Sequence, residues 1–128
     1  MLGFTHMQPF SAYFTSAERK RDLLEDRHVL ALIEFGNAGG TSVVDPRRIT
    51  VGLRQLGPTS QLEVWRSETP VESGIHGQVA YSGNDEVLVG HIAVDDREFP
   101  DMEAASRHAY EAILPFGAEM GFPHYLRI

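Results

Sequence analysis

The stretch Val29-Leu30-Ala31-Leu32-Ile33-Glu34-Phe35 is an apolar run of strand length, and Gly36-Asn37 follows it directly. It shows neither helical periodicity nor regular alternation with polar residues. Such a run, bounded by turn-forming residues, is typical of a strand that is buried on both of its faces. The stretch therefore predicts a fully buried strand.

Further strands are expected downstream of this run. Ile49, Val51 and Leu53 alternate with polar or small residues, which is typical of a half-buried strand. Residues 62–66 form another short strand. Residues 78–81 and 87–94 flank four small and polar residues that predict a hairpin turn, Ser82-Gly83-Asn84-Asp85.

The clearest helix is expected to begin after Asp101, which is a suitable N-cap. Apolar residues then recur at helical spacing, namely Met102, Ala105, Ala109, Ala112, Ile113, Phe116 and Met120. Pro115 lacks a backbone donor and crowds the preceding turn, so it predicts a kink or an early end there. Gly121 and Pro123 stop the helix. Residues 123–128 are expected to begin one more strand, which either pairs inside a sheet or continues in the natural polypeptide.

The first part of the chain differs in character from the rest. Residues 1–27 are expected to form an irregular, aromatic-rich N-terminal lead, in which the charged stretch 17–26 makes a possible short helix capped by Ser16. Residues 28–128 are expected to form a single α+β domain.

Composition narrows the functional class. The chain has 128 residues, of which 42% are hydrophobic, and a net charge of −7. It is long enough to bury the core of one domain. The acidic balance argues against nucleic acid, and the basic run Arg19-Lys20-Arg21 is flanked by acidic residues, as on a solvated helix. The absence of cysteine, of a spanning apolar stretch and of a signal peptide leads us to expect a cytoplasmic protein with no membrane contact.

No pattern in the sequence identifies a self-sufficient catalytic site. The six histidines lack the paired spacing that places two metal ligands on one helix face, so no metal is expected. No Gly-x-Ser-x-Gly elbow is present, and no cofactor motif is found. Acidic residues gather near the start of the expected helix, where capping and solubility explain them. The sequence therefore leaves the catalytic residues unknown.

Several short motifs share their order and spacing with one known family. They are Ile49-Thr50-Val51-Gly52-Leu53-Arg54-Gln55-Leu56, Glu63-Val64-Trp65-Arg66-Ser67, Pro70-Val71, Gly74, His76-Gly77, Tyr81-Ser82, Gly90-His91-Ile92 and Gly121-Phe122-Pro123-His124-Tyr125-Leu126-Arg127-Ile128. Together they resemble the chorismatases, also called pteridine-dependent dioxygenase-like proteins. The resemblance extends from about Val29 to Ile128, whereas residues 1–27 match nothing.

The resemblance implies an α+β fold similar to the YjgF/RidA proteins (chorismate-mutase-like), with a mixed β-sheet and helices packed on one face. Chorismatases look like two such units fused, and this chain would be the first. They hydrolyse chorismate to pyruvate plus a dihydroxycyclohexadienoate or a hydroxybenzoate. Their acid, a glutamate, and most of their substrate-binding arginines lie in the second unit and match no position here. The chain alone is therefore expected to be inactive.

One basic residue is a candidate for substrate binding. Arg127 follows the helix on the expected terminal strand, where RidA-like proteins place an arginine that holds a carboxylate. A structural ion pair or an exposed position is the alternative. Arg54 and Arg66 alternate with apolar residues on their strands and are expected at the surface or at a sheet edge.

Three functions remain open from the sequence. The first is the N-terminal portion of a chorismatase-like enzyme, whose partners are an anionic small molecule and the C-terminal half of the same enzyme or a second subunit. The second is a stand-alone RidA-like trimer that binds small metabolites or deaminates imines. The third is a non-catalytic assembly domain.

Overall fold

The fold is described from a computed structural model, in which residues 10–35, 45–51 and 61–122 are described. The strands and helices run along the chain in the order β1 (Phe10–Ser16), η2 (Ala17–Arg19), α1 (Lys20–Glu25), β2 (Val29–Phe35), β3 (Arg48–Val51), β4 (Gln61–Ser67), β5 (Glu72–His76), β6 (Val79–Gly83), β7 (Leu88–His91), η3 (Asp96–Glu98) and α2 (Met102–Glu119). None of the described helices is long and apolar enough to cross a membrane.

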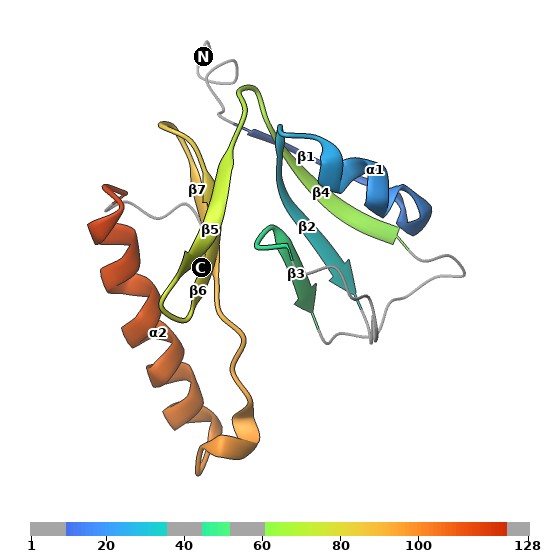
Figure 1. The fold of residues 1–128 in the computed structure, drawn as a ribbon. Helices are drawn as coiled ribbons and strands as arrows, with labels where there is room; N and C mark the ends of the chain where they lie inside the picture. Colours follow the sequence, from blue (N-terminus) through green and yellow to red (C-terminus); the bar gives the residue numbers. More distant parts are fainter. Residues whose placement is uncertain (1–9, 36–44, 52–60, 123–128) are drawn as a thin grey trace, which may run out of the picture.

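These strands form two sheets, so the fold is a mixed α+β arrangement (Figure 1). The first sheet has the order β1-β4-β2-β3, with β2 and β3 parallel and the other pairs antiparallel. The second sheet is antiparallel, in the order β5-β6-β7. In Figure 1, α1 lies against the first sheet, and α2 lies on the far side of the second sheet.

The expected buried strand is confirmed as β2, which lies between β4 and β3. Its residues Val29 to Leu32 are fully buried. On one face of the sheet, Leu23 of α1 packs with Val29 and Leu32 of β2 and with Leu62 and Val64 of β4. Burial of such side chains contributes about 1.5–3 kcal/mol each. This cluster is the core of the first sheet, and it fixes which face of β4 points away from α1.

The face of the first sheet that points away from α1 is here called the distal face. Side chains alternate between the two faces of a strand, and residues opposite each other in register share a face. The register therefore places Phe14, Glu63, Ile33 and Ile49 in one row across the distal face. A second row contains Ala12, Trp65 and Ala31.

A hydrogen bond at an irregularity in β2 links the two sheets. The register of β2 against β4 shifts between Val29 and Ala31, and the hydroxyl of Ser82, on β6, donates a hydrogen bond to the carbonyl oxygen of Leu30. A residue at such a shift lies outside the regular hydrogen-bond ladder of the sheet, so its buried carbonyl oxygen needs a donor from elsewhere. Ser82 supplies that donor from the second sheet.

The expected hairpin between residues 78 and 94 is confirmed, with a shifted turn. Strand β6 extends through Ser82 and Gly83, and the turn begins at Asn84. The Asn84 side-chain oxygen accepts hydrogen bonds from the backbone N–H groups of Glu86 and Val87. A Cβ atom on Gly83 would lie 2.6 Å from the carbonyl oxygen of Val87, so only glycine fits the end of this strand.

The expected helix is confirmed as α2, with one correction at Pro115. The Asp101 carboxylate caps the helix by accepting from the backbone N–H of Ala104 at 2.8 Å. The early end expected at Pro115 is wrong, because the helix continues to Glu119. Phe116 follows the proline and is buried against β5 and β6, 5.6 Å from the Tyr81 ring and 5.8 Å from the His76 ring. We attribute the persistence of the last turn to this packing.

The irregular lead expected over residues 1–27 is corrected for the part that is described. Phe10–Ser16 forms strand β1 and pairs with β4 over its whole length. Its aromatic residues and Thr15 favour a strand, but most of its side chains are exposed, and pairing with β4 holds the segment in the sheet. The short helix is confirmed as η2 and α1, and Ser16 accepts from the N–H of Glu18.

Candidate functional site

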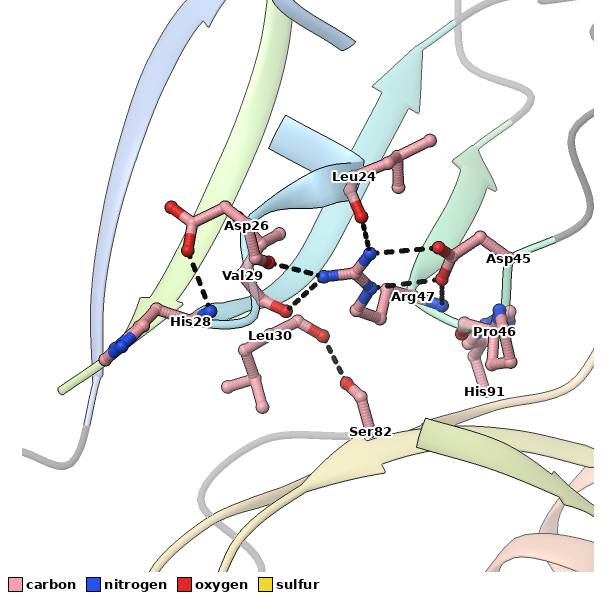
Figure 2. Close-up of polar contacts among 10 residues, drawn as sticks. All are labelled: Leu24, Asp26, His28, Val29, Leu30, Asp45, Pro46, Arg47, Ser82 and His91. Carbon is pink, nitrogen blue, oxygen red and sulfur yellow. Dashed lines mark hydrogen bonds and ion pairs between the residues drawn. The ribbon is translucent and has the colours of Figure 1, made fainter. Parts of the chain in front are cut away.

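The most conspicuous polar centre surrounds Arg47, which is 8% exposed and precedes β3 (Figure 2). Its Nη1 donates to the carbonyl oxygens of Asp26 at 2.7 Å and Val29 at 3.2 Å. Its Nη2 donates to the Leu24 carbonyl and, at 3.0 Å, to the Asp45 carboxylate, which also accepts from Nε at 3.1 Å. A guanidinium has five N–H groups, and each has an acceptor here.

The Arg47 centre is therefore a structural connection rather than an anion site. The carbonyl groups of Leu24 and Asp26 lie at the C-terminal end of α1, where helix carbonyls lack helical partners and attract cations. Burial alone raises the pKa of Asp45, but hydrogen bonds from Arg47 outweigh it and lower that pKa. With all donors occupied, Arg47 has no capacity left for a substrate carboxylate.

A shallow depression of about 170 Å³ adjoins this centre. Its lining residues are Leu24, Glu25, Asp26, Arg27, Arg47, Val71 and Ser73. Pockets for drug-sized ligands usually enclose about 300–1,000 Å³. The depression is too small for such a ligand, and its charges largely balance.

A second charged centre lies beneath α1. Glu34 of β2, 3% exposed, contacts Lys20 Nζ at 2.5 Å and Arg48 Nε at 2.8 Å. Burial raises the pKa of Glu34, but the hydrogen bonds and charges of Arg48 and Lys20 outweigh burial and lower it. A general acid that operates near neutral pH needs a raised pKa. Glu34 is thus a poor general acid and is held as a structural anion.

Residue types of a Ser-His-Asp triad meet near the end of β4, but their geometry is different. The His28 ring Nδ1 lies 3.2 Å from the backbone carbonyl oxygen of Ser67, while the Ser67 hydroxyl accepts from Asn84 at 2.7 Å. Asp26 accepts from the backbone N–H of His28, which is the main reason that its pKa is lowered. No proton path from the hydroxyl through the ring is formed, so this cluster is not a nucleophilic centre.

Three other histidines link elements of the fold. His76 contacts Glu119 at 3.1 Å, His108 contacts the Gln78 side chain at 2.9 Å, and His91 contacts the Pro46 carbonyl at 2.8 Å. Within the described ranges, no three His, Asp or Glu side chains are grouped as they would be around a metal ion.

The sequence-based candidates for anion binding are only partly described. Arg127, the predicted substrate-binding residue, lies outside the described residues, as does Arg54. Arg66 is 43% exposed and forms an ion pair with Asp26 at 3.4 Å, so the expectation of a surface position is confirmed. The structure thus brings none of the predicted arginines together in a described cleft.

The distal face is the most unusual surface of the described chain. The Phe10 and Trp65 rings stack on it at 5.1 Å, and Phe14 is 61% exposed. Trp65 Nε1 is buried without a hydrogen-bond partner among the described residues. Glu63 lies between Phe14 and Ile33 in the register, and no ion pair is formed by its carboxylate within the described part of the chain. Glu63 cannot be singled out from the sequence, because its apolar neighbours on this face belong to other strands.

Comparisons with known proteins agree with this architecture. The family model described as "Chorismatase FkbO/Hyg5-like, N-terminal" matches residues 63–128. The chain is also similar to the crystal structure of a chorismatase, with a TM-score of 0.69 and 26% sequence identity. That likeness covers 89% of this chain and 34% of the chorismatase, so the chain spans about a third of its length. No curated protein matches significantly.

The family match includes β5, β6, β7 and α2, together with all but two residues of β4. The solved chorismatase extends the likeness to most of the chain. On this evidence, the chain belongs to the family of N-terminal domains of FkbO/Hyg5-like chorismatases.

Proposed function

We propose that this chain is the N-terminal portion of an enzyme that hydrolyses chorismate, releasing pyruvate and a dihydroxycyclohexadienoate or a hydroxybenzoate. The observation that carries the proposal is the match to the N-terminal domain family of chorismatases, supported by the likeness to a solved chorismatase. Because the chain spans a third of that protein's length, the activity belongs in this proposal to the whole enzyme.

The chemistry of the reaction supports a site shared with a C-terminal unit. Loss of the enolpyruvyl group needs a neutral acid that protonates the vinyl ether methylene, and water that traps the resulting cation. It also needs cations that hold two substrate carboxylates. In the described segments, the pKa values of Asp26, Glu34 and Asp45 are all lowered by nearby donors. These three carboxylates are therefore poor candidates for the acid, and we propose that the C-terminal unit supplies it, as the resemblance to chorismatases implies.

The distal face is the surface on which we propose that this C-terminal unit packs. Buried donors in native structures nearly always have acceptors, so the unpaired Trp65 Nε1 is unusual for a complete domain. The exposed aromatic ring of Phe14 beside it is likewise costly to leave in water. A YjgF/RidA-like arrangement, in which helices cover one side of a sheet and another unit covers the other, would account for both features.

Arg127 remains our candidate for contact with a substrate carboxylate. A guanidinium can bind a carboxylate through two parallel hydrogen bonds. In the proposed enzyme, this arginine would help to orient chorismate while the acid comes from the C-terminal unit. Arg127→Lys keeps the charge and loses the bidentate geometry, so it should raise KM for chorismate.

The test is a fusion in which this chain, through Ile128, replaces the matching part of the solved chorismatase. Chorismate consumption and pyruvate release by the fusion are measured with the isolated chain as control. Turnover by the fusion supports the proposal. A correctly folded fusion that leaves chorismate intact refutes it, and deamination of imino acids by a trimer of the isolated chain would favour the RidA-like alternative.

A further inference from the structure

Glu63 occupies an unusual position on the distal face. It lies on β4 opposite Phe14 of β1 and Ile33 of β2, and Ile33 is in turn opposite Ile49 of β3. Leu62 and Val64, its neighbours in sequence, point into the core beneath α1. The Glu63 side chain therefore points to the other face and is surrounded by apolar residues in its row.

The carboxylate has no cation within the described part of the chain. Other half-buried and buried carboxylates in these segments are paired, as Glu34 is with Lys20 and Asp45 is with Arg47. Burial of a carboxylate without a partner is strongly unfavourable, whereas an exposed one is solvated at little cost. Glu63 is partly exposed here. It can remain unpaired only while the distal face stays open to water.

We infer that Glu63 marks the place where a cationic side chain, arginine or lysine, of the C-terminal unit docks on the distal face. The inference rests on the proposed function, which names that unit as the occupant. Charge complementarity selects the partner's chemistry, because a second unit that covers the apolar row must neutralise the carboxylate. Chorismate itself carries two carboxylates and would be repelled, so Glu63 contacts protein rather than substrate.

If Glu63 contacts the C-terminal unit, its substitution should destabilise the fusion but not the isolated chain. A residue that matters only within this domain would affect both proteins. In the isolated chain, Glu63→Gln removes no ion pair, so the urea midpoint stays the same or rises slightly. In the fusion with the C-terminal part of the solved chorismatase, the same change leaves a buried cation unpaired. There we expect a loss of about ten-fold or more in the folding equilibrium constant.

The experiment compares urea unfolding of the isolated chain and of the fusion, each as wild type, Glu63→Gln and Glu63→Lys. Glu63→Lys places like charges together and should lower the fusion midpoint further than Glu63→Gln. Glu111→Gln is the matched control, since Glu111 lies exposed on α2 and the change in charge is the same. Glu111→Gln should leave the urea midpoints of both proteins unchanged.

A urea midpoint that Glu63→Gln lowers in the fusion, but leaves unchanged or raises in the isolated chain, supports the inference. Equal destabilisation of both would show that Glu63 acts within this domain, and an unchanged fusion would show that no cation docks there. Independent unfolding of the two parts would also overturn the inference. If Glu63→Gln destabilises the fusion as expected but the wild-type fusion leaves chorismate intact, only the proposed function is refuted.

Discussion

The buried carboxylate Glu34 gives the sharpest prediction about stability. Glu34→Gln keeps the shape of the side chain but removes the charge that Lys20 and Arg48 contact at 2.5 and 2.8 Å. Removing one partner of a buried ion pair typically costs about 3–5 kcal/mol. Lys20 and Arg48 keep 21% and 10% of their side-chain surface exposed, so water relieves part of this cost. We expect a loss of about 3 kcal/mol in the free energy of unfolding.

The assay is urea denaturation followed by the fluorescence of Trp65, the only tryptophan in the chain. With a slope of about 2 kcal/mol per M, a loss of about 3 kcal/mol lowers the midpoint by about 1.5 M. Glu18→Gln serves as control, because Glu18 is exposed on η2 in the same part of the chain. It should move the midpoint little.

The pH dependence of this difference has a definite sign. The pKa of Glu34 is lowered from its ordinary value of 4.5. Its ionised form therefore contributes stability that is fully present above pH 4.5 and is lost as the pH falls through the lowered pKa. The gap between wild type and Glu34→Gln should be constant near neutrality and should narrow in acid. A gap below about 1 kcal/mol at neutral pH, or one that does not narrow in acid, would refute this reasoning.

Three further predictions concern single contacts. Arg47→Lys keeps the charge but loses most of the contacts to Asp45 and to the carbonyls of α1, so urea unfolding should show a loss of about 2–3 kcal/mol in the free energy of unfolding. Arg27→Lys, at an exposed position, is the control, and an equal loss in both variants would contradict this prediction. Ser82→Ala leaves the Leu30 carbonyl without its donor and should cost about 1–2 kcal/mol by the same assay, whereas the exposed Ser73→Ala should cost little. Asp101→Ala removes the N-cap of α2 and should lower the free energy of unfolding by about 1 kcal/mol. Asp101→Asn keeps an acceptor oxygen and should retain most of that stability in thermal unfolding monitored by circular dichroism. Equal losses in the two variants would argue against capping.

The elements that were predicted from sequence are those with a strong local signal. The apolar run of β2 and the N-cap and helical periodicity of α2 can each be recognised from neighbouring residues in the sequence. Strands β1 and β5 cannot, because their side chains are mostly exposed and their order comes from β4 and β6. Gly74 of β5 illustrates the difficulty: a Cβ there would lie 2.9 Å from the Tyr81 hydroxyl, a constraint that is visible only once the strands are paired.

The candidate site was less predictable than the fold. Family motifs identified the chorismatase relationship, yet the distal face could not be recognised from sequence. Glu63 becomes notable only when the register places Phe14 and Ile33 beside it. Likewise, Arg47 gives no sequence signal of its own, since its acceptors at Leu24 and Asp26 are more than twenty residues away. Long-range pairing, rather than local pattern, determines what these charges do.

Whether the catalytic site is shared between two units can be measured as pyruvate release from chorismate, first for the isolated chain and then for the chain mixed with the C-terminal part of the solved chorismatase. We expect no release by the chain alone and a saturable rise as the C-terminal part is added, above any activity of that part by itself. Pyruvate release by the isolated chain would contradict a shared site, because the chain would then contain a complete site.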